Sequence, residues 1–388
     1  MKNRTWRYIV AIMSVIYLVG STVMPVKAAS TYKAPRAGTA PTTSPKQNWD
    51  SLVAAAKKEG TVSIYALNWG PQTRVAVIEA FKAKYGINVE FSPFSRGAEL
   101  QAKVEAEQRA GLFLADVFGA GSNTYLSGMK PAGVLGEIEP MLVLPEVTDG
   151  KNWTTGRVPF VDKDRTFIAM ISSLQRNIVY NTDMIKKGEI TDYPDILKPQ
   201  YKGKITMNDP TVTGPGGDFM THLVVNIWDL AGAKTYLTQL VGMQQAVIER
   251  DNRIQVESVA RGKYPIGLAP NPNSMANLLN MGAHLDVVHF KQGVRATSAA
   301  GALGVPIKQA HPNAAKLFVN WLLTKEGQTV FSKGFGNPSL RMDVTTEGFS
   351  PMFLPQPGEK IFPDSEDFLR HTKEVLNMAK QVIDAANR

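Results

Sequence analysis

The feature that most constrains the fold is a regular alternation of short apolar segments with amphipathic helical ones, between residues 49 and 118. The strand-like runs are rich in β-branched and apolar residues, and they are residues 61–66, 87–91 and 114–118. Apolar residues recur at helical spacing in the segments between them, which are residues 49–59, 71–85 and 98–110. Because strands that alternate with helices form βαβ units, this order predicts an α/β fold with a parallel sheet.

The loops that follow these predicted strands are made of small and polar residues. They are Asn68-Trp69-Gly70, Ser95-Arg96-Gly97 and Gly121-Ser122-Asn123. In a parallel sheet, ligands bind beyond the carboxyl ends of the strands, next to helix N-termini. A single strand-to-helix loop often has this composition, but three in succession on one edge indicate a binding edge.

The middle of the chain shows the same succession of predicted strands, turns and helices. Residues 172–180 and 264–268 have strand patterns, and the glycine-rich turn 208–218 (NDPTVTGPGGD) leads into a helical segment. Free backbone N–H groups at the start of that helix can hold an anion. The turn lacks Gly-Lys-Ser/Thr, so it is not a Walker loop.

The first 28 residues have the order of a secretory signal peptide. Met1–Arg7 is basic, Tyr8–Met24 is apolar, and Val26-Lys27-Ala28 is a small-x-small cleavage signal. We expect cleavage after Ala28. An uncleaved anchor is the alternative, because the apolar run approaches the roughly 20 residues of a membrane span. Residues 29–48, which are rich in Pro and Thr, are predicted to form a disordered linker.

Composition and missing motifs exclude several classes of function. The chain has no cysteine, which excludes disulfides, a thiol nucleophile and a lipid-modified N-terminal cysteine. Its net charge is +9 without basic clusters, so nucleic acid is not an expected partner. No HExxH, Gly-x-Ser-x-Gly or strand-linked Gly-x-Gly-x-x-Gly occurs. We therefore expect neither an enzyme nor a cofactor nor a histidine-based metal site.

One set of motifs, in one order, resembles a known family. The most specific stretch is 311–328 (HPNAAKLFVNWLLTKEGQ), followed by 336–341 (GNPSLR). Supporting stretches are 177–184, 197–210 and 262–268. With them the chain resembles the periplasmic solute-binding proteins of ABC importers, in the type II subclass that includes ferric-ion binders.

This resemblance implies two Rossmann-like α/β lobes joined by a two-strand hinge and closing on a solute. The crossovers are expected near 169–180 and 287–304. Lobe 1 is then predicted to comprise 49–172 and 293–342, and lobe 2 to comprise 173–292 and 343–388. Ligand sites favour such domain interfaces, and closure needs only a few hinge residues.

The ferric subclass uses a histidine in the first loop, an acid after the third strand and two adjacent tyrosines. This chain has Asn68-Trp69, Gly121-Ser122 and Pro272-Asn273 at the matching places. Direct iron binding is therefore an alternative rather than the main expectation.

Residues that the family uses for anions match better, so the resemblance implies a small organic anion as the solute. Arg176 and Arg96 are the candidate cations, because a guanidinium grips carboxylate or phosphate with two hydrogen bonds. The candidate ligand-binding residues are Asn68, Trp69, Arg96, Ser122, Asn123, Arg176, Gly214, Gly216, Asp218, Asn252 and Asn271. Three of these residues could instead have a structural role. Arg176 could form a salt bridge across the hinge, Trp69 could belong to the core, and Asp218 could neutralise one of the arginines.

The expected function is that of a periplasmic, monomeric binding protein that delivers its solute to an ABC permease in the inner membrane. Two other classes stay open. One is a membrane-tethered sensor, if the apolar N-terminal segment is not cleaved. The other is an enzyme on the same fold, which no nucleophile, metal cluster or cofactor loop supports.

Overall fold

The computed structural model describes residues 45–386. The predicted signal peptide and the predicted linker up to residue 44 lie outside the described residues. Residues 45–48 form the start of helix α1 (Pro45–Glu59) and do not belong to a linker. Within the described part, no helix combines the length and apolarity that a membrane span requires.

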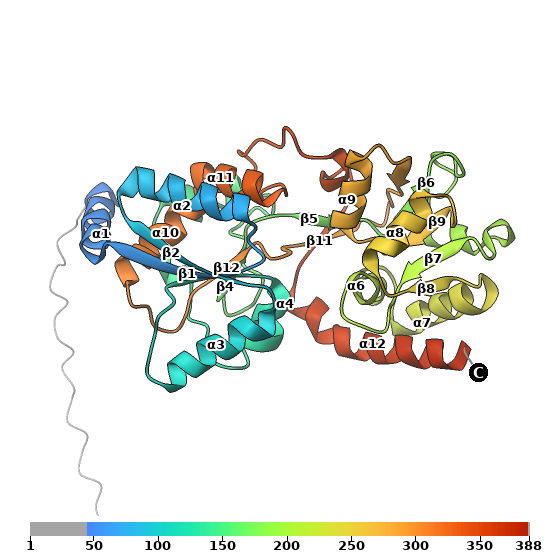
Figure 1. Cartoon of the computed structure of the whole chain (residues 1–388), viewed down its shortest axis with the longest axis horizontal. Coiled ribbons are helices and arrows are strands. Elements are labelled where there is room, and N and C mark those ends of the chain that lie inside the picture. Colours follow the sequence, from blue (N-terminus) through green and yellow to red (C-terminus); the bar gives the residue numbers. More distant parts are fainter. Residues whose placement is uncertain (1–44, 387–388) are drawn as a thin grey trace, which may run out of the picture. The chain divides into compact units, whose positions relative to one another are not determined.

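A first five-stranded sheet has the order β2-β1-β3-β12-β4, with β1, β2 and β3 parallel and β12 antiparallel to β3 and β4 (Figure 1). Its strands are β1 (Thr61–Leu67), β2 (Asn88–Phe94), β3 (Val117–Ala120), β4 (Phe167–Ala169) and β12 (Ala302–Gly304). The helices around it include α1, α2 (Pro71–Tyr85), α3 (Gly97–Arg109), α4 (Ser122–Thr124), α5 (Pro145–Thr148), α10 (Pro312–Leu323) and α11 (Lys325–Phe335). We call this sheet with its helices lobe 1.

Both faces of this sheet are buried, as parallel sheets require. Alternate residues of β1 point to opposite faces. Ile64 and Ala66 pack with α2, α10 and α11, whereas Tyr65 and Leu67 pack with α3. The run TVSIYAL is thus apolar almost throughout because it has no solvent-exposed face.

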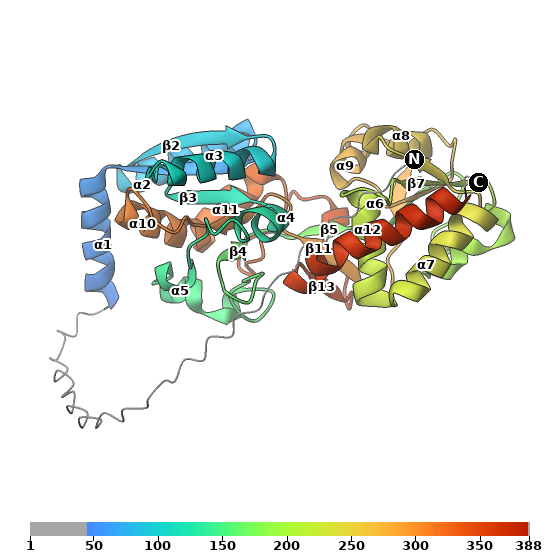
Figure 2. The same ribbon diagram turned by 90° about the horizontal axis from the view of Figure 1, so that it is seen from below.

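A second five-stranded sheet has the order β10-β6-β9-β7-β8. Its strands are β6 (Ile178–Asn181), β7 (Ile205–Asn208), β8 (Val247–Glu249), β9 (Ile266–Leu268) and β10 (Leu285–Val287). Helices α6 (Pro215–His222), α7 (Leu230–Thr238) and α12 (Glu366–Ala386) share one core, and α8 (Asn252–Ala260) and α9 (Pro272–Asn280) share another. We call this sheet with its helices lobe 2, in which α12 lies along α6 and α7 (Figure 2).

The two lobes are joined by a small sheet with the order β13-β11-β5. Its strands are β5 (Ser173–Gln175), β11 (Val294–Thr297) and β13 (Ile361–Pro363). β5 leads from the first sheet into the second, and β11 leads back, which confirms the two predicted crossovers. β13 pairs in parallel with β11 and adds a third strand that the sequence did not predict. We call this sheet the hinge sheet. The exact lobe boundaries stay a prediction.

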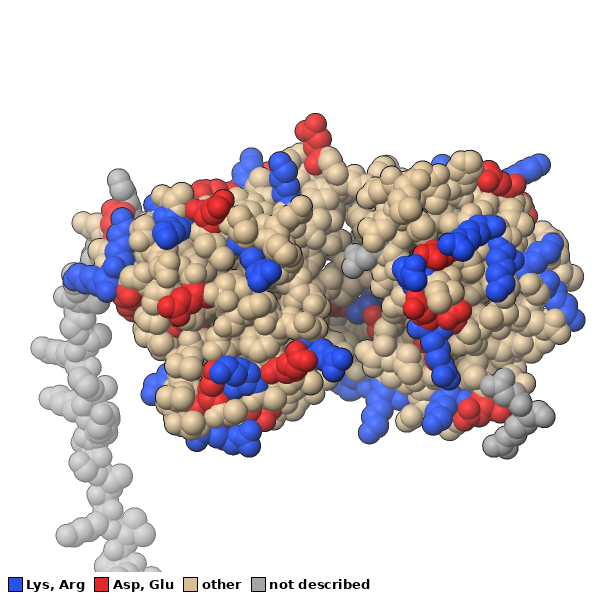
Figure 3. All heavy atoms as spheres, in the orientation of Figure 1, with Lys and Arg blue, Asp and Glu red and all other residues tan. Residues whose placement is uncertain are grey.

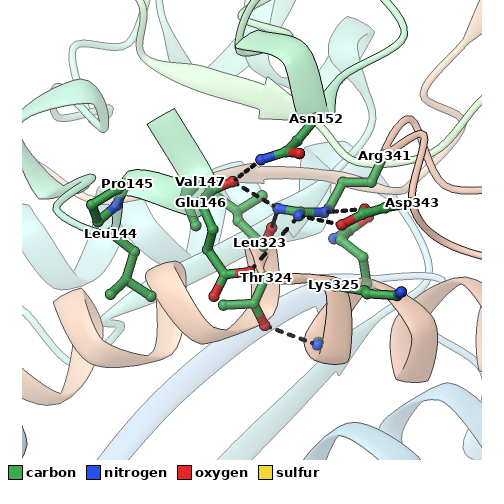
Figure 4. Close-up of polar contacts among 12 residues, drawn as sticks. Leu144, Pro145, Glu146, Val147, Asn152, Leu323, Thr324, Lys325, Arg341 and Asp343 are labelled. Atoms are coloured by element: carbon green, nitrogen blue, oxygen red, sulfur yellow. Dashed lines mark hydrogen bonds and ion pairs between the residues drawn. The ribbon is translucent and has the colours of Figure 1, made fainter. Parts of the chain in front are cut away.

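The chain reaches β13 along a segment that is anchored in lobe 1 by Arg341 (Figure 4). Its buried guanidinium donates two hydrogen bonds to Asp343 and two to the backbone carbonyls of Glu146 and Leu323. It also lies 5.5 Å from the ring of Trp153. The GNPSLR motif therefore fixes the point at which the chain leaves lobe 1 for the second time, in its third crossing between the lobes.

Three expected strand boundaries are wrong. The expected third strand, 114–118, is observed as β3 from Val117 to Ala120. The expected second strand, 87–91, ends too early, because β2 continues through Phe94 in register with β1. The expected long strand 172–180 is two strands, β5 and β6, separated by Arg176 and Asn177. That break is where the chain leaves the hinge sheet and enters the second sheet.

Candidate functional site

A cleft of about 600 Å³ is lined by residues from lobe 1, lobe 2 and the hinge sheet. Figure 3 shows the face on which the molecule is hollowed between the lobes, with blue and red side chains interspersed on both. The volume lies within the roughly 300–1,000 Å³ of small-molecule sites, which favour domain interfaces.

The lobe 1 wall of the cleft is polar and uncharged. It comes from loops at the carboxyl ends of β1 and β3 and from the region after α11. Its polar residues are Asn68, Thr73, Ser122, Asn123, Thr124 and Asn337. Ser122 is tied to the crossover loop after β11, because its Oγ lies 2.8 Å from Ser298 Oγ. This wall offers amide and hydroxyl groups but no fixed charge.

Helix N-termini from both lobes line the cleft. Gly70, Gly214 and Asn271 are the N-cap residues of α2, α6 and α9, and all three border the cavity. Backbone N–H groups in the first turn of a helix lack intrahelical partners and carry partial positive charge. The cleft is therefore rich in donors that belong to the backbone.

The glycine-rich turn before α6 allows the N-terminus of this helix to reach the cleft. Gly214 has φ of 144°, a conformation that L side chains rarely adopt. A Cβ on Gly216 would lie 2.4 Å from the carbonyl oxygens of both Asn208 and Asp209. Glycine is needed at 216 so that α6 can start directly against the end of β7.

The fixed charges of the cleft form one cluster around Arg295 of β11. Arg295 is 4% exposed, and its guanidinium contacts Asp364 at 2.6 Å and Asp218 at 3.1 Å. It also lies 3.8 Å from the ring of Phe368 on α12. Burial alone would lower the pKa of Arg295, but the two carboxylates outweigh burial and raise it.

The two carboxylates of this cluster differ in how completely they are bonded. Asp364 is held by Arg295, by Thr297 Oγ1 at 2.9 Å and by the Ser298 N–H at 3.1 Å. Asp218, in the first turn of α6, uses Oδ2 for Arg295, and its side chain is 30% exposed towards the cleft. Burial raises the pKa of Asp218, against the opposing influence of Arg295. Asp218 is thus the acidic group that a bound molecule can still contact.

Six of the eleven sequence-predicted residues line this cleft. They are Asn68, Ser122, Asn123, Gly214, Asp218 and Asn271. The other five lie outside its lining, and they are Trp69, Arg96, Arg176, Gly216 and Asn252.

Two of those five, Trp69 and Gly216, have structural roles inside lobe 1 and at the start of α6. Trp69 is core: it is 3% exposed, packs on Phe331 with ring centroids 4.8 Å apart, and donates its indole N–H to the Ala300 carbonyl. Gly216 supports the turn described above. The aromatic Tyr125, which follows the third predicted loop, is likewise fully buried, and its hydroxyl donates to the Phe118 carbonyl.

The remaining positions are an exposed arginine, the start of α8 and the hinge arginine. The Arg96 side chain is 81% exposed, 4.0 Å from Glu99, and Asn252 begins α8 outside the cleft. Arg176 is buried, forms an ion pair with Glu359, and donates to the Met352 and Leu354 carbonyls. The arginine predicted to grip the solute therefore holds the third crossing against the hinge sheet.

Sequence reasoning missed the charged centre of the cleft. Arg295 lies within the predicted second crossover, so its position on the hinge follows from the sequence, but the predicted cation is Arg176 on the first crossover. Asp364 had no local signal, because it reaches the cleft only through β13. Among the described residues, no group of three or more His, Asp or Glu is placed to hold a metal ion.

Residues 76–352 match a family model described as bacterial extracellular solute-binding protein. The chain belongs to this family. The match covers more than half of the chain, including the first sheet from α2 onward, most of the second lobe and two strands of the hinge sheet. The predicted fold class, two Rossmann-like lobes joined at a hinge, is confirmed by the structure and by solved structures with the same fold.

Relatives of this solute-binding protein bind different molecules. The spermidine/putrescine-binding periplasmic protein 1 of Haemophilus influenzae is 22% identical over 77% of this chain and 80% of its own. Mannheimia haemolytica ferric iron-binding protein A, in an open conformation, has a TM-score of 0.66 at 14% identity, over 84% of this chain and 98% of its own.

A third relative, the periplasmic binding protein AfuA from Actinobacillus pleuropneumoniae, was solved with fructose-6-phosphate bound. It has a TM-score of 0.54 at 21% identity, covering 84% of this chain and 97% of its own. At such low identity these likenesses establish the fold of the solute-binding protein but not its solute, which has to be argued from the cleft.

Proposed function

We propose that this chain is the periplasmic solute-binding component of an ABC importer. It captures a small organic solute between its lobes and delivers it to a permease in the inner membrane. The observation that carries this proposal is the cleft of about 600 Å³ whose walls come from both lobes and the hinge sheet. Such a site can change shape by hinge closure, which a permease can distinguish from the empty state.

The chemistry of the cleft supports an organic anion that also carries a hydrogen-bond donor. Three helix N-termini and Arg295 supply donors for a carboxylate or phosphate. The fixed charges that line the cleft, Asp218, Asp364 and Arg295, have an excess of one negative charge. A ligand that carries only hydrogen-bond acceptors would be repelled by the exposed part of the Asp218 carboxylate. Amino acids, hydroxy acids and aminophosphonates have the required pair of groups.

Ferric ion and polyamines are the competing ligands. Hard Fe³⁺ prefers phenolate and carboxylate oxygens, and the described lining of the cleft contains no tyrosine and no histidine. A polyamine would use Asp218 but leave the helix N-termini without an acceptor. Both therefore rank below a donor-bearing anion.

The test is a thermal-shift screen of the predicted mature chain, starting at Ala29, followed by calorimetric titration of each hit. The panel contains amino acids, hydroxy acids, plain dicarboxylates, aminophosphonates, sugar phosphates, putrescine, spermidine and ferric citrate. A solute at about 100 times its Kd stabilises the folded protein by about 2.7 kcal/mol. We expect a Tm rise of about 2–4 °C for a donor-bearing anion.

Two variants locate the binding site. Arg295→Met should abolish the shift, whereas Arg96→Met, a matched removal of an exposed arginine, should leave it unchanged. A hit restricted to ferric citrate or to polyamines would contradict the solute class. The proposed solute-binding function would be contradicted if no compound of the panel raised the Tm and if X-ray scattering showed the same interlobe distance with and without the panel compounds.

A further inference from the structure

A second, much smaller cavity lies behind the cleft. Its volume is about 10 Å³, which is the size of one water molecule or one oxygen atom. It shares Gln175, Pro215, Asp218 and Arg295 with the lining of the cleft. Its remaining wall includes His222, at the end of α6. The small cavity therefore borders the cleft along the side that carries its charges.

His222 presents an unused polar atom in this wall. The side chain is 1% exposed, and its Nδ1 lies 3.1 Å from Nδ2 of Asn226. An amide nitrogen only donates, so Nδ1 of His222 is the acceptor and the proton of the neutral ring lies on Nε2. Nε2 is buried and has no hydrogen-bond partner. The ring thus carries a donor without an acceptor.

The neutral state of this ring agrees with its surroundings. Burial, together with the positive charge of Arg295, lowers the pKa of His222 to about 3. At neutral pH the imidazole therefore has a single proton, and the contact with Asn226 assigns that proton to Nε2.

Arg295, which also lines this cavity, has a second unused donor. Its two terminal nitrogens contact Asp218 and Asp364, but its Nε is buried and has no hydrogen-bond partner. A buried unpaired donor costs about 1–3 kcal/mol, more when it is charged. Two of them around one cavity of atomic size indicate a missing acceptor. That acceptor must be an oxygen that enters from the cleft or is trapped as water.

We propose that this cavity is the oxygen subsite of the cleft: it takes one acceptor oxygen of the solute's carboxylate or phosphate group between His222 Nε2–H and Arg295 Nε–H. This inference rests on the proposed function and adds to it the atom that orients the solute. Asp218, which borders both cavities, then receives the donor group of the same solute. The cavity is too small for more than that one oxygen, so the rest of the solute lies in the cleft.

The first test needs no knowledge of the natural solute. The mature protein is labelled with ¹⁵N-histidine and titrated with sodium formate, and separately with methylammonium chloride at the same ionic strength. The His222→Gln variant identifies the His222 signals among the five histidines. We expect a proton on Nε2 of His222 and a saturable shift of that resonance with formate alone. A proton on Nδ1, or no response to formate, would overturn the proposal.

The second test uses the anion found in the thermal-shift screen. His222→Phe keeps a planar ring but removes the donor, and we expect a Kd at least about ten-fold higher. His222→Gln restores an N–H donor and should recover most of that loss. The matched control is His284→Phe, at a side chain that is 66% exposed on the surface. Unchanged affinity in His222→Phe would refute the subsite.

A crystal structure of the complex separates the two sources of the oxygen. A solute oxygen within hydrogen-bond distance of both Nε atoms supports the proposal, whereas a water there with and without solute overturns it. Failure of the screen to find any solute would contradict the proposed function, while the formate titration would still decide on the subsite.

Discussion

The first and second crossings between the lobes each carry a buried arginine, and the two arginines have different roles. Arg176 follows β5 and Arg295 lies on β11, and both are less than 5% exposed and ion-paired. Every nitrogen of the Arg176 guanidinium has a partner within the C-terminal segment. Arg295 keeps one nitrogen unpaired and borders both cavities, whereas Arg176 borders only the small one.

This difference shows how to separate a structural arginine from a ligand-binding one on the same hinge. Burial and an ion pair are common to both, so neither property identifies the binding residue. The unpaired donor beside the cleft points to Arg295, because most buried N–H groups in folded proteins have an acceptor. The following predictions test this contrast, beginning with the largest expected effect.

Removing Arg176 should damage stability far more than binding. Arg176→Met leaves Glu359 buried without its guanidinium, and breaking a buried pair costs about 3–5 kcal/mol. Urea unfolding should show a loss of that size, while the folded fraction still binds its solute with nearly the Kd of the unchanged protein. The double variant Arg176→Met/Glu359→Gln, which removes the stranded charge, should recover part of the loss. If instead the affinity fell with little change in stability, the roles of the two arginines would be reversed.

The same ion pair predicts a pH dependence. Burial opposes ionisation of Glu359, but hydrogen bonds with His289 and Arg176 outweigh it and lower its pKa from 4.5 to about 2. A lowered carboxyl pKa contributes stability that is present above pH 4.5 and is lost as the pH falls towards 2. The free energy of unfolding should therefore fall over this window.

The Glu359→Gln variant is the control for that window. It lacks the titrating group, so it should be less stable at pH 6 and should lose less stability between pH 4.5 and 2. Parallel pH profiles of variant and unchanged protein would show that Glu359 is not the group responsible.

Replacing Asp218 should change selectivity more than stability. In Asp218→Asn, Arg295 still contacts Asp364, so we expect a stability change below about 1 kcal/mol. The preference for an amino or hydroxy acid over its analogue without that group should fall by about ten-fold. Calorimetric titration of such a pair of solutes measures it. An unchanged preference would mean that the solute's donor does not contact Asp218.

The smallest effect concerns the loop that follows β11. Ala299 borders the cleft with φ of 47°, whereas the path through β5 has no non-glycine residue with positive φ between residues 169 and 177. Replacing Ala299 with glycine relieves the strain of the positive φ, which stabilises the folded protein by about 1–2 kcal/mol. The added freedom of glycine in the unfolded chain destabilises the folded protein by about 0.4–1 kcal/mol, which is the smaller contribution. Ala299→Gly should therefore stabilise slightly in urea unfolding, and Ala300→Gly, without that conformation, should destabilise.

The sequence predicted those features of the fold that depend on residues close together in the chain. The run TVSIYAL is buried on both faces of its sheet, and Gly86, with φ of 71°, ends α2 where the sequence indicated. The loops after β1 and β3 and the turn before α6 line the cleft because they follow strand ends. These positions needed no knowledge of distant partners.

The rest depends on contacts between segments far apart in the chain. Nothing near Arg176 indicates that Glu359, 183 residues later, neutralises it, and nothing near Arg295 indicates Asp364. The third hinge strand is only three residues long, IFP, and is defined by its pairing with β11. Choosing between the two arginines therefore required the fold.

The late position of Asp364 has a consequence for the order in which a growing chain acquires its activity. The cleft's charged cluster combines Asp218 and Arg295 with an aspartate that leads into the final helix, and Glu366 in that helix contacts Lys130 of lobe 1 at 3.3 Å. Domains tend to fold from the N-terminus as the chain is synthesised, so lobe 1 can begin to form long before this cluster exists. A nascent or prematurely terminated chain that stops before residue 364 would have most of both sheets and yet no completed charge cluster. Binding competence would thus arrive almost last, when the C-terminal segment docks against both lobes.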